Sequence, residues 1–440
     1  MGLGPAGIGS TFTLLKNNNH YNILCIDAGY LHNLRRCNIL SNGDCKHHEP
    51  CKIISGFGGC TLLGGGKISC YPAGSGLSKI LHSDDILKLK LNESYELIRK
   101  YLDLKKFQLC EHNLDVISNY FKKEGFNYKY YEVFNYDEQE LLKFYDYMYE
   151  FFKRKNINLL LNTTITNISY DNNKFILQGK NNLNSKQVKI ITKYLILAVG
   201  RLGYKFLINI NKKLKLGGKK NKIDIGVRLE MPNHLLNKVI NYHGDLKLLF
   251  NNSRTFCVCK NGKIAPYYLD NFYTTEGHMY INYNTKYTNL SILTRYYQND
   301  IYNLIKNKTI NINQNKPLSQ NYIDYIKNKP TKKLSNTTSI KYLSCGNIND
   351  CFPQKMSCEI KDNVNSFVSA FIPEKERPCI TVYGPEIEYR GLEFPVQSDF
   401  SITNHLYLIG DCVGHFRGFL QAFCSGKICA ESILGDLNEN

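Results

Sequence analysis

The feature that most constrains the fold of this chain is a glycine pattern at its N-terminus. Gly2, Gly4 and Gly7, within the opening MGLGPAGIGS, have the spacing G-x-G-x-x-G. This spacing is typical of the turn between the first strand and the first helix of a dinucleotide-binding fold, where the backbone must approach a pyrophosphate closely. Only Met1 precedes the first glycine. The pattern therefore predicts a phosphate-binding turn that lacks its first strand.

The residues after this turn continue the same pattern. Residues 8–15 carry apolar side chains at near-helical spacing and predict a short helix, and the apolar run YNILCIDAG at 21–29 predicts a buried strand. Asp27 stands at the end of that run, about 20 residues beyond Gly7, where a dinucleotide-binding fold places the carboxylate that binds a ribose diol. The carboxylate at this offset strengthens the interpretation of the glycine turn.

The C-terminal region has a comparable order of elements. Residues 405–437 (HLYLIGDCVGHFRGFLQAFCSGKICAESILGDL) predict an apolar strand, a glycine-rich turn and an amphipathic helix. Asp411, at the end of the strand, can accept hydrogen bonds from sugar hydroxyls. The helix after Gly418 offers free backbone N–H groups and the positive end of its dipole, which suit an electron-rich ring edge.

Between these ends the chain predicts a mixed α/β fold. Residues 52–77 are dense in glycine, with Lys67 among them, and predict a loop that can approach a large flat ligand. Residues 84–155 are expected to be mostly helical, and residues 157–200 contain three strand-like runs. The Asn-rich stretch at 288–328 is expected to be helical.

Composition limits the cellular setting and the partners. The formal net charge of +18 is spread along the chain with Lys, Asn, Ile and Tyr, so it indicates a compositional bias; RNA binding is not expected, although the charge does not exclude it. Sixteen cysteines without a secretory signal indicate reduced thiols and a cytoplasmic location. No apolar run is long enough to span a membrane, so no membrane partner is expected.

In combination, these motifs resemble those of the two-dinucleotide-fold flavoproteins of the glutathione-reductase-like superfamily. The matching segments are GLGPAG with Asp27, TTITNI, YLILAVGRLG and the C-terminal LYLIGDCVGHFRG. More narrowly, the chain is similar to a family of uncharacterised FAD-dependent dehydrogenases, through SGFGG, GGGKIS, IGVRLE and RTFCVC. The resemblance covers nearly the whole chain.

The resemblance implies an α/β fold with a Rossmann-like FAD-binding domain, without its first strand, and an inserted α+β substrate domain. The FAD-binding domain would comprise residues 1–205 and 375–440, and the substrate domain residues 206–374. No second glycine motif of this kind occurs in the middle of the chain. A separate NAD(P)H domain is therefore not expected, and NAD(P)H would bind only transiently, as a reductant, at the flavin.

The resemblance also implies the residues that bind FAD. The N-terminal turn would cradle the pyrophosphate, Asp27 would bind the adenosine ribose, and the strand near Ile165 would face the adenine. The turns after the strands that end near Gly200 and Gly410 would face the ribityl chain and the isoalloxazine. The cofactor-binding residues expected from these positions are Gly2, Gly4, Pro5, Ala6, Gly7, Asp27, Ile165, Gly200, Gly410, Asp411, Gly414 and Gly418.

Three residues are candidates for catalysis. Lys67 could stabilise negative charge on a reduced flavin, and it could equally be a surface lysine. His415 and Arg417, in the C-terminal turn, could bind an anionic substrate or move a proton; exposed polar turn residues are the alternative. No metal site is expected, because Cys37, Cys45 and the residues around them lack a paired zinc-ligand spacing.

Two further patterns favour structural roles. Arg228 and Glu230 share one face of a predicted strand and are expected to pair with each other. Cys257 and Cys259 also share a strand face, and a disulfide across one intervening residue would be strained. Thiol redox chemistry is therefore not expected at this pair.

The best interpretation is an FAD-dependent dehydrogenase that transfers a hydride between a small-molecule substrate and bound flavin. One alternative is a flavin-dependent tRNA-modifying protein, which shares the N-terminal loop and the C-terminal turn and fits the positive charge. Another is a non-catalytic homologue truncated at its N-terminus, which the absent first strand favours. Neither the substrate nor the electron acceptor follows from the sequence.

Overall fold

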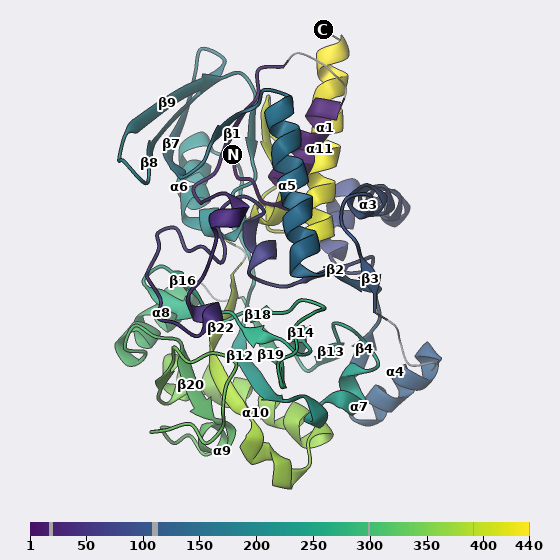
Figure 1. The fold of residues 1–440 in the computed structure, drawn as a ribbon, viewed down its shortest axis with the longest axis vertical. Helices are drawn as coiled ribbons and strands as arrows, with labels where there is room; N and C mark the ends of the chain where they lie inside the picture. Colours follow the sequence, from purple (N-terminus) through teal and green to yellow (C-terminus); the bar gives the residue numbers. More distant parts are fainter. Residues whose placement is uncertain (17–20, 108–112, 298–299, 390, 440) are drawn as a thin grey trace.

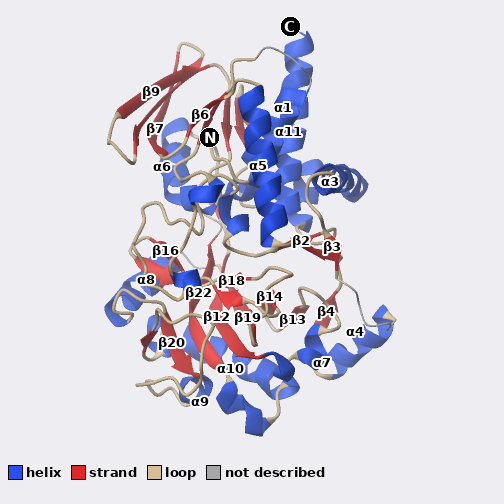
Figure 2. Ribbon diagram, viewed as in Figure 1, coloured by secondary structure: helices blue, strands red, loops and turns tan. Residues whose placement is uncertain are grey.

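The chain folds into two lobes (Figure 1). A computed structural model describes residues 1–16, 21–107, 113–297, 300–389 and 391–439. The upper lobe in the view of Figure 1 contains both the N-terminal turn and the C-terminal helix, and the lower lobe contains a large sheet. Both lobes contain strands and helices (Figure 2), which confirms the mixed α/β class predicted from the sequence.

Short parallel strands form the centre of the upper lobe. β1 (Leu24–Ile26) pairs with β6 (Asn158–Leu160), and β10 (Leu195–Leu197) pairs with β25 (Leu406–Leu408), both in parallel. β24 (Ser401–Thr403) adds an antiparallel strand beside β25. The run at 21–29 thus contains the predicted strand, with Asp27 directly after it.

Met1 and Gly2 lie between β1 and β10 and join these two pairs. The Met1 nitrogen donates to the carbonyl of Ile196 at 2.8 Å, and the Met1 carbonyl accepts from the N–H of Ala198 at 2.7 Å. On the other side, the Gly2 N–H donates to the carbonyl of Ile26 at 2.7 Å. The sequence predicted a turn that lacks its first strand. In the structure Met1 and Gly2 take part of that strand's place, because their hydrogen bonds to β1 and to the segment of β10 position the turn.

Long helices pack beside this parallel layer. They are α1 (Pro5–Lys16), α3 (Asp84–Arg99), α5 (Glu138–Arg154) and α11 (Phe419–Glu439). α1 and α11 cross closely, since a Cβ on Gly9 would lie 2.6 Å from the carbonyl oxygen of Phe423 and one on Gly426 would lie 2.0 Å from that of Ala6. Asp137 caps α5 by accepting from the N–H of Gln139, as its position before the amphipathic run favours.

The rest of the upper lobe surrounds this centre. β7 (Thr163–Asp171), β8 (Lys174–Asn181) and β9 (Gln187–Thr192) form an antiparallel meander. The strand-like runs predicted for residues 157–200 are thus five strands, β6 to β10, because the first and last runs each divide at a short turn. The remaining elements are α2 (Ser78–Leu81), α6 (Tyr204–Leu214) and the small sheet of β2 (Lys67–Ser69), β5 (Val133–Asn135) and β3 (Lys105–Lys106).

An eight-stranded sheet forms the lower lobe, in the order β21-β20-β22-β12-β19-β14-β13-β4. Its strands are β4 (Asn127–Lys129), β12 (Ile223–Pro232), β13 (Lys247–Phe250), β14 (Ser253–Cys259), β19 (Tyr287–Tyr296), β20 (Leu318–Asn321), β21 (Ser344–Cys345) and β22 (Thr381–Tyr389). Because β4 and β22 belong to this sheet, it extends beyond residues 206–374 at both ends, past the bounds expected for a substrate domain.

The expected helix at 288–328 is wrong over its first part, which is the central strand β19. Its polar residues obscure the strand pattern, yet Thr288, Asn289, Ser291 and Thr294 are buried and hydrogen-bonded or packed inside the sheet. Thr294, for example, shares a 2.7 Å hydrogen bond with Ser253 on the neighbouring strand. Helices occur only later in this stretch, as α8 (Ile301–Ile312) and α9 (Tyr322–Ile326).

Helix α10 (Gln354–Phe371) packs against the large sheet through buried Ile360, Val364 and Phe367. The other elements that the structure describes include α4 (Leu114–Lys123), α7 (Asn237–Ile240) and three two-stranded ribbons. The ribbons are β11 (Lys219–Lys220) with β23 (Leu392–Glu393), β15 (Lys263–Ile264) with β18 (Gly277–His278), and β16 (Tyr267–Leu269) with β17 (Phe272–Thr274). Among the residues that the structure describes, every helix is too short or too polar to cross a bilayer.

Candidate active site

A cavity of about 1190 Å³ lies where the two lobes meet. The upper lobe contributes the N-terminal turn, the glycine-rich loop of residues 52–77 and the C-terminal turn, and the lower lobe contributes residues of β12 and β14. Small-molecule sites are typically roughly 300–1,000 Å³. This cavity therefore has room for a dinucleotide together with a second small ligand.

The three glycines of the N-terminal turn have three different environments. A Cβ on Gly2, where φ is +96°, would lie 2.2 Å from the carbonyl oxygen of Ala198, so only glycine fits this turn. A Cβ on Gly7 would lie 1.9 Å from the carbonyl oxygen of Gly2, so this glycine packs the helix against the turn. A Cβ on Gly4 would have Gly59 Cα, 3.7 Å away, as its nearest neighbour.

These environments match the roles of the three glycines in a dinucleotide-binding turn: a tight turn, close approach of a pyrophosphate, and close helix packing. Gly2, Gly4, Pro5 and Ala6 line the cavity. Pro5 is the first residue of α1, where its missing N–H has no cost. Of the five residues expected here at the pyrophosphate, Gly7 alone does not line the cavity, because its contribution is to packing.

Asp27 lies beside this turn and is almost fully buried. Its Oδ2 accepts from the N–H of Leu3 at 2.7 Å, and its Oδ1 accepts from the N–H of Gly29 at 2.8 Å. The carboxylate thus holds the glycine turn to the end of β1. A carboxylate has about four acceptor sites, so each oxygen can accept one more hydrogen bond from a ligand in the cavity that Asp27 lines.

Ile165 and Gly200 lie at two other edges of the cavity. The start of β7 is tied to Asp27, whose carbonyl accepts from the N–H of Thr163 at 2.9 Å. Ile165 therefore lies toward the Asp27 end of the cavity. Gly200 follows β10 with a φ of +56° and has open space where a Cβ would be.

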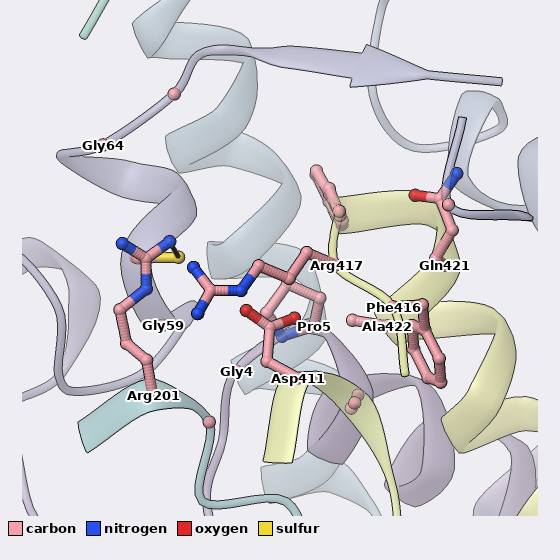
Figure 3. A pocket seen from close by; sticks show the side chains of 18 of the residues that line it. Gly4, Pro5, Gly59, Gly64, Arg201, Asp411, Phe416, Arg417, Gln421 and Ala422 are labelled. Carbon is pink, nitrogen blue, oxygen red and sulfur yellow. Dashed lines mark hydrogen bonds between the residues drawn. The ribbon is translucent and has the colours of Figure 1, made fainter. Parts of the chain in front are cut away.

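The C-terminal turn lines the cavity beside the N-terminal turn. Gly410, Asp411, Gly414 and Gly418 all contribute to the lining, and Figure 3 shows Asp411 among the residues around Gly4 and Pro5. Gly414 has a φ of +87°, and a Cβ there would lie 2.2 Å from the carbonyl oxygen of Leu392. The turn leads directly into α11, so the N-termini of α1 and α11 both lie at this cavity.

Gln421, in the first turn of α11, was not singled out in the sequence. Its Nε2 donates to the carbonyls of Ser69 and Ala73, both at 2.9 Å, and these two bonds fix the orientation of the amide. Its Oε1 is buried and has no hydrogen-bond partner in the described part of the chain. Gln421 also lines the cavity, so its two hydrogen bonds join the start of α11 to the glycine-rich loop at this edge of the cavity.

Lys67 lines the cavity from β2, but its ammonium group is engaged. Its Nζ lies 2.6 Å from Asp245 Oδ1 and also donates to the carbonyl of Val258. Burial works against the charged lysine, but Asp245 raises the pKa of Lys67 above its usual value. Lys67 keeps the pKa of Asp245 below its usual value despite burial. Lys67 is thus a buried, paired cation and not the surface lysine considered as an alternative.

Arg417 and Arg201 lie close to Asp411 in the site (Figure 3), and both form buried ion pairs. Arg417 donates to Glu388 and to the carbonyl of Tyr389. Arg201 donates to both carboxylate oxygens of Glu276, at 3.0 and 3.3 Å, and lies 3.9 Å from Glu388. The Nε atoms of both arginines are buried and have no hydrogen-bond partner among the described residues.

His415 also lines the cavity, and its ring is held by the backbone. Its Nε2 lies 3.0 Å from the carbonyl oxygen of Phe394 and donates to it, while its Nδ1 lies 3.7 Å from Glu393 Oε1. The imidazole is mostly buried rather than an exposed turn residue. The structure therefore brings all three candidate catalytic residues to the cavity and gives each of them a partner.

The expected pairing of Arg228 with Glu230 is wrong. Arg228 donates from Nε and from Nη2 to the two oxygens of Glu386, both at 2.7 Å, and its side chain is fully buried. Glu230 instead accepts from the hydroxyl of Tyr383 at 2.6 Å. The partner of Arg228 is on the neighbouring strand β22, which spacing along one strand cannot reveal.

Within the ranges that the structure describes, His, Cys, Asp and Glu side chains form no cluster of three or more that could hold a metal ion. One of the cysteines that line the cavity, Cys60, has its pKa raised by burial to about 11. It lies beside Arg201, whose Nη2 is 4.0 Å from its sulfur. Cys60 therefore stays a thiol at neutral pH.

Comparisons with known proteins give only distant likenesses. No protein-family model matches the chain, and no curated protein matches its sequence. A flavoprotein/dehydrogenase from Cytophaga hutchinsonii aligns with 100% of this chain and 78% of its own, at 8% identity and a TM-score of 0.41. CtdE in complex with FAD aligns with 97% of this chain and 81% of its own, at 10% identity and a TM-score of 0.33.

The tetracycline destructase Tet(51) is a third such structure. It aligns with 100% of this chain and 80% of its own, at 10% identity and a TM-score of 0.37. These neighbours are described as flavoproteins or as enzymes, but TM-scores and identities this low carry no argument about this chain. The assignment of a function depends on the residues around the cavity.

Proposed function

We propose that this chain is an FAD-dependent oxidoreductase that transfers a hydride between a small-molecule substrate and flavin bound in the cavity. The observation that carries this proposal is the convergence of two helix N-termini, those of α1 and α11, on one cavity. Helix N-termini present unpaired N–H groups and a positive dipole end, so each favours an electronegative group. FAD has two such groups, its pyrophosphate and the pyrimidine edge of its flavin ring.

The residues around the cavity fit this cofactor along its length. The open position at Gly4 leaves space for a phosphate against the start of α1. Asp27 has acceptor sites left for ribose hydroxyls, with Thr163 and Ile165 beside it toward the adenine. At the other end, the N-terminus of α11, whose residues Phe419 and Gln421 line the cavity, would face the flavin ring. The FAD-binding part would thus be Rossmann-like, with the parallel layer of β1, β6, β10 and β25.

When bound, FAD would supply the two-electron chemistry, and the protein would supply placement and electrostatics. The glycine turns would hold the cofactor by backbone N–H groups, which need no proton to be gained or lost. Arg201 and Arg417, which line the cavity, would supply positive charge beside an anionic or carbonyl oxygen of the substrate. His415, with Nε2 fixed by Phe394, is the candidate to hold or move a proton at Nδ1.

The sequence suggested that Lys67 stabilises negative charge on a reduced flavin, but here we assign it a positioning role. Its charge is compensated by Asp245, so it positions the residues around it. A nicotinamide dinucleotide, which would serve as a transient reductant, would enter the same cavity, since no second glycine turn of this type is present in the sequence.

The proposal is tested by the substitution Gly4→Ala. The Cβ has space in the flavin-free protein, so the free energy of unfolding without FAD should change by less than about 1 kcal/mol. The same Cβ would occupy the place of the phosphate, so the Kd for FAD should rise at least about 100-fold. Both quantities are measured on the purified full chain, by urea unfolding and by the change of flavin fluorescence on titration.

The matched control is Gly435→Ala, at an exposed helical glycine of α11 with no heavy atom within 4 Å of the new Cβ. This variant should bind FAD as the wild type does. The proposal is wrong if the wild-type chain binds no FAD after reconstitution, or if Gly4→Ala binds FAD as tightly as the control.

A further inference from the structure

Cys257 and Cys259, near the end of β14, have sulfur atoms 3.8 Å apart. In a regular strand, residues two apart share a face, and a disulfide between them is strained. Here the pairing register of β14 with β19 shifts between Phe256 and Cys259, which marks a bulge. Cys257 takes a left-handed backbone conformation, with φ of +47°. The bulge therefore removes the regular-strand geometry on which the sequence-based expectation rested.

The bulge is held in place by two buried ion pairs. Asp245 accepts from the N–H of Val258 at 3.0 Å, and Lys67 donates to the carbonyl of the same residue. Arg228, paired with Glu386, donates from Nη1 to the carbonyl of Cys257 at 3.1 Å. A left-handed conformation at a non-glycine residue costs roughly 1–3 kcal/mol and persists only where its surroundings enforce it. Here the Lys67–Asp245 pair holds Val258 and Arg228 holds Cys257, so the left-handed conformation of Cys257 is maintained.

The two sulfurs differ in their access to the cavity. Cys257 is half-buried and lines the cavity, whereas Cys259 is fully buried behind it. Gly277 allows this packing, because a Cβ there would lie 2.6 Å from the Cys259 sulfur. A small molecule in the cavity can therefore reach Cys257 first, with Cys259 as the nearest thiol behind it.

Two cationic groups near the pair favour loss of a proton from one of the two thiols. Burial opposes ionisation of Cys259, but the hydrogen bond from Cys257 and the charges of Lys67 and Arg228 lower its pKa below the usual thiol value. The hydrogen bond to Cys259, together with burial, raises the pKa of Cys257. A thiolate next to a thiol is the starting state for thiol–disulfide exchange.

We propose that Cys257 and Cys259 form a redox-active dithiol that closes to a reversible disulfide by exchange with a small-molecule disulfide in the cavity. The proposal is independent of bound flavin. It adds a second site of two-electron chemistry to the cavity, on the lower lobe and opposite the two helix N-termini.

The exchange has two steps. The Cys257 sulfur passes its proton to the Cys259 thiolate and attacks the disulfide, which releases one thiolate and leaves a mixed disulfide on Cys257. The released thiolate takes the proton from Cys259, whose sulfur attacks Cys257 and releases the second thiolate. One Cys257–Cys259 bond forms and the external disulfide bond breaks. The pair is oxidised by two electrons, and the small molecule is reduced to one thiol and one thiolate.

The experiment uses the full chain, equilibrated in buffers of varied ratio of reduced to oxidised glutathione. The chain is then unfolded in denaturant that contains excess N-ethylmaleimide, so that free thiols buried in the fold, such as Cys259, are blocked as well. It is then digested with trypsin. Cleavage after Arg254 and Lys260 yields TFCVCK, which contains both cysteines and no other. Mass spectrometry measures the fractions of this peptide with an internal disulfide, one glutathione or two blocked thiols.

We expect the internal disulfide to rise with oxidation as a two-electron transition and to return to two blocked thiols after dithiothreitol. In Cys259→Ser, glutathione should remain bound to Cys257 as a mixed disulfide. In Cys257→Ser, the buried Cys259 should carry no glutathione. The exposed Cys358 serves as the reference for unspecific oxidation. The wild-type measurement needs no variant to fold. The proposal is overturned if TFCVCK stays fully blocked at every ratio, or takes up glutathione without closing.

Discussion

Two walls of the cavity are built by different means. The first, the backbone wall, consists of the turns that begin α1 and α11, where N–H groups and glycines face the cavity. The second, the side-chain wall, is lined by Lys67, Asp245, Arg201, Glu276 and Arg417. Four buried ion pairs hold it: Lys67–Asp245, Arg201–Glu276, Arg417–Glu388 and, behind Cys257, Arg228–Glu386. Backbone donors carry no titratable proton and no side-chain entropy, whereas each buried ion pair must offset the cost of removing two charges from water.

This difference predicts which kind of substitution destabilises each wall. The backbone wall should fail sterically, when an added atom forces two main-chain segments apart. The side-chain wall should fail electrostatically, when one charge of a pair is removed or when pH changes the charge of a buried group.

The largest effect is expected from Gly7→Ala on the backbone wall. The new Cβ would lie 1.9 Å from the carbonyl oxygen of Gly2, so α1 must move away from the turn that Asp27 and Ile26 hold. We expect the free energy of unfolding to fall by about 5 kcal/mol, at the upper end for single substitutions. Urea unfolding monitored by circular dichroism measures this loss.

Gly435→Ala is the matched control, since it makes the same change in a helix where the Cβ meets no atom within 4 Å. Alanine is the better helix former, so this variant should be more stable by about 0.5–1 kcal/mol. Equal losses in the two variants would contradict the steric account of the backbone wall.

A smaller loss is expected from Glu386→Gln on the side-chain wall. Gln has the same shape but cannot compensate the charge of Arg228, whose side chain is fully buried. Removing one partner of a buried pair leaves an uncompensated charge, so the free energy of unfolding should fall by about 3 kcal/mol. The loss is measured by urea unfolding at neutral pH.

Asp85→Asn provides the comparison on the surface, where Asp85 lies 3.3 Å from Lys88 and is 94% exposed. Solvent screens such a pair, and the carboxylate also favours the N-terminus of α3, so the free energy of unfolding should fall by at most about 1 kcal/mol. If Glu386→Gln lowered the free energy of unfolding as little as Asp85→Asn does, burial would not increase the contribution of an ion pair to stability.

The two walls also differ in what the sequence predicts. Gly2, Asp27 and Asp411 could be placed at the site because each is fixed by a short local segment, a strand followed by a turn. The open position at Gly4 and the packing at Gly7 follow from the same local geometry. Their roles in binding FAD remain predictions.

The side-chain wall could not be predicted, because its pairs join residues far apart along the chain. Arg228 and Glu386 are 158 residues apart, and spacing within one strand favoured Glu230 instead. The bulge at Cys257 could not be predicted for the same reason. It depends on Lys67 of β2 and on the pair of Arg228 (β12) with Glu386 (β22), which are far from Cys257 along the chain. The strand at 287–296 was also missed, because its polar residues are hydrogen-bonded only after the sheet forms.

The smallest of the three effects on stability concerns pH and is expected at His278, next to the residues of the side-chain wall. The ring is fully buried, and neither nitrogen has a hydrogen-bond partner in the part of the chain described. Burial lowers the pKa of His278 to about 3. In the unfolded chain a histidine has a pKa of about 6.5. The unfolded state therefore binds a proton that the folded state does not, and stability falls as pH decreases from about 6.5 toward 3.

His278→Leu should remove this part of the pH dependence. At about 1.4 kcal/mol per pH unit, the wild type should lose about 2 kcal/mol between pH 6.5 and pH 5 that the variant retains. The measurement is urea unfolding of both proteins at pH 8, 6.5 and 5. Tyr283→Phe is the control, because Tyr283 packs edge-on against the same ring at 5.4 Å and its change leaves the imidazole in place. If the free energy of unfolding fell equally with pH in the wild type and in His278→Leu, the buried ring would not be the cause of the acid sensitivity. If it fell less steeply in His278→Leu alone, the acid sensitivity would be assigned to His278.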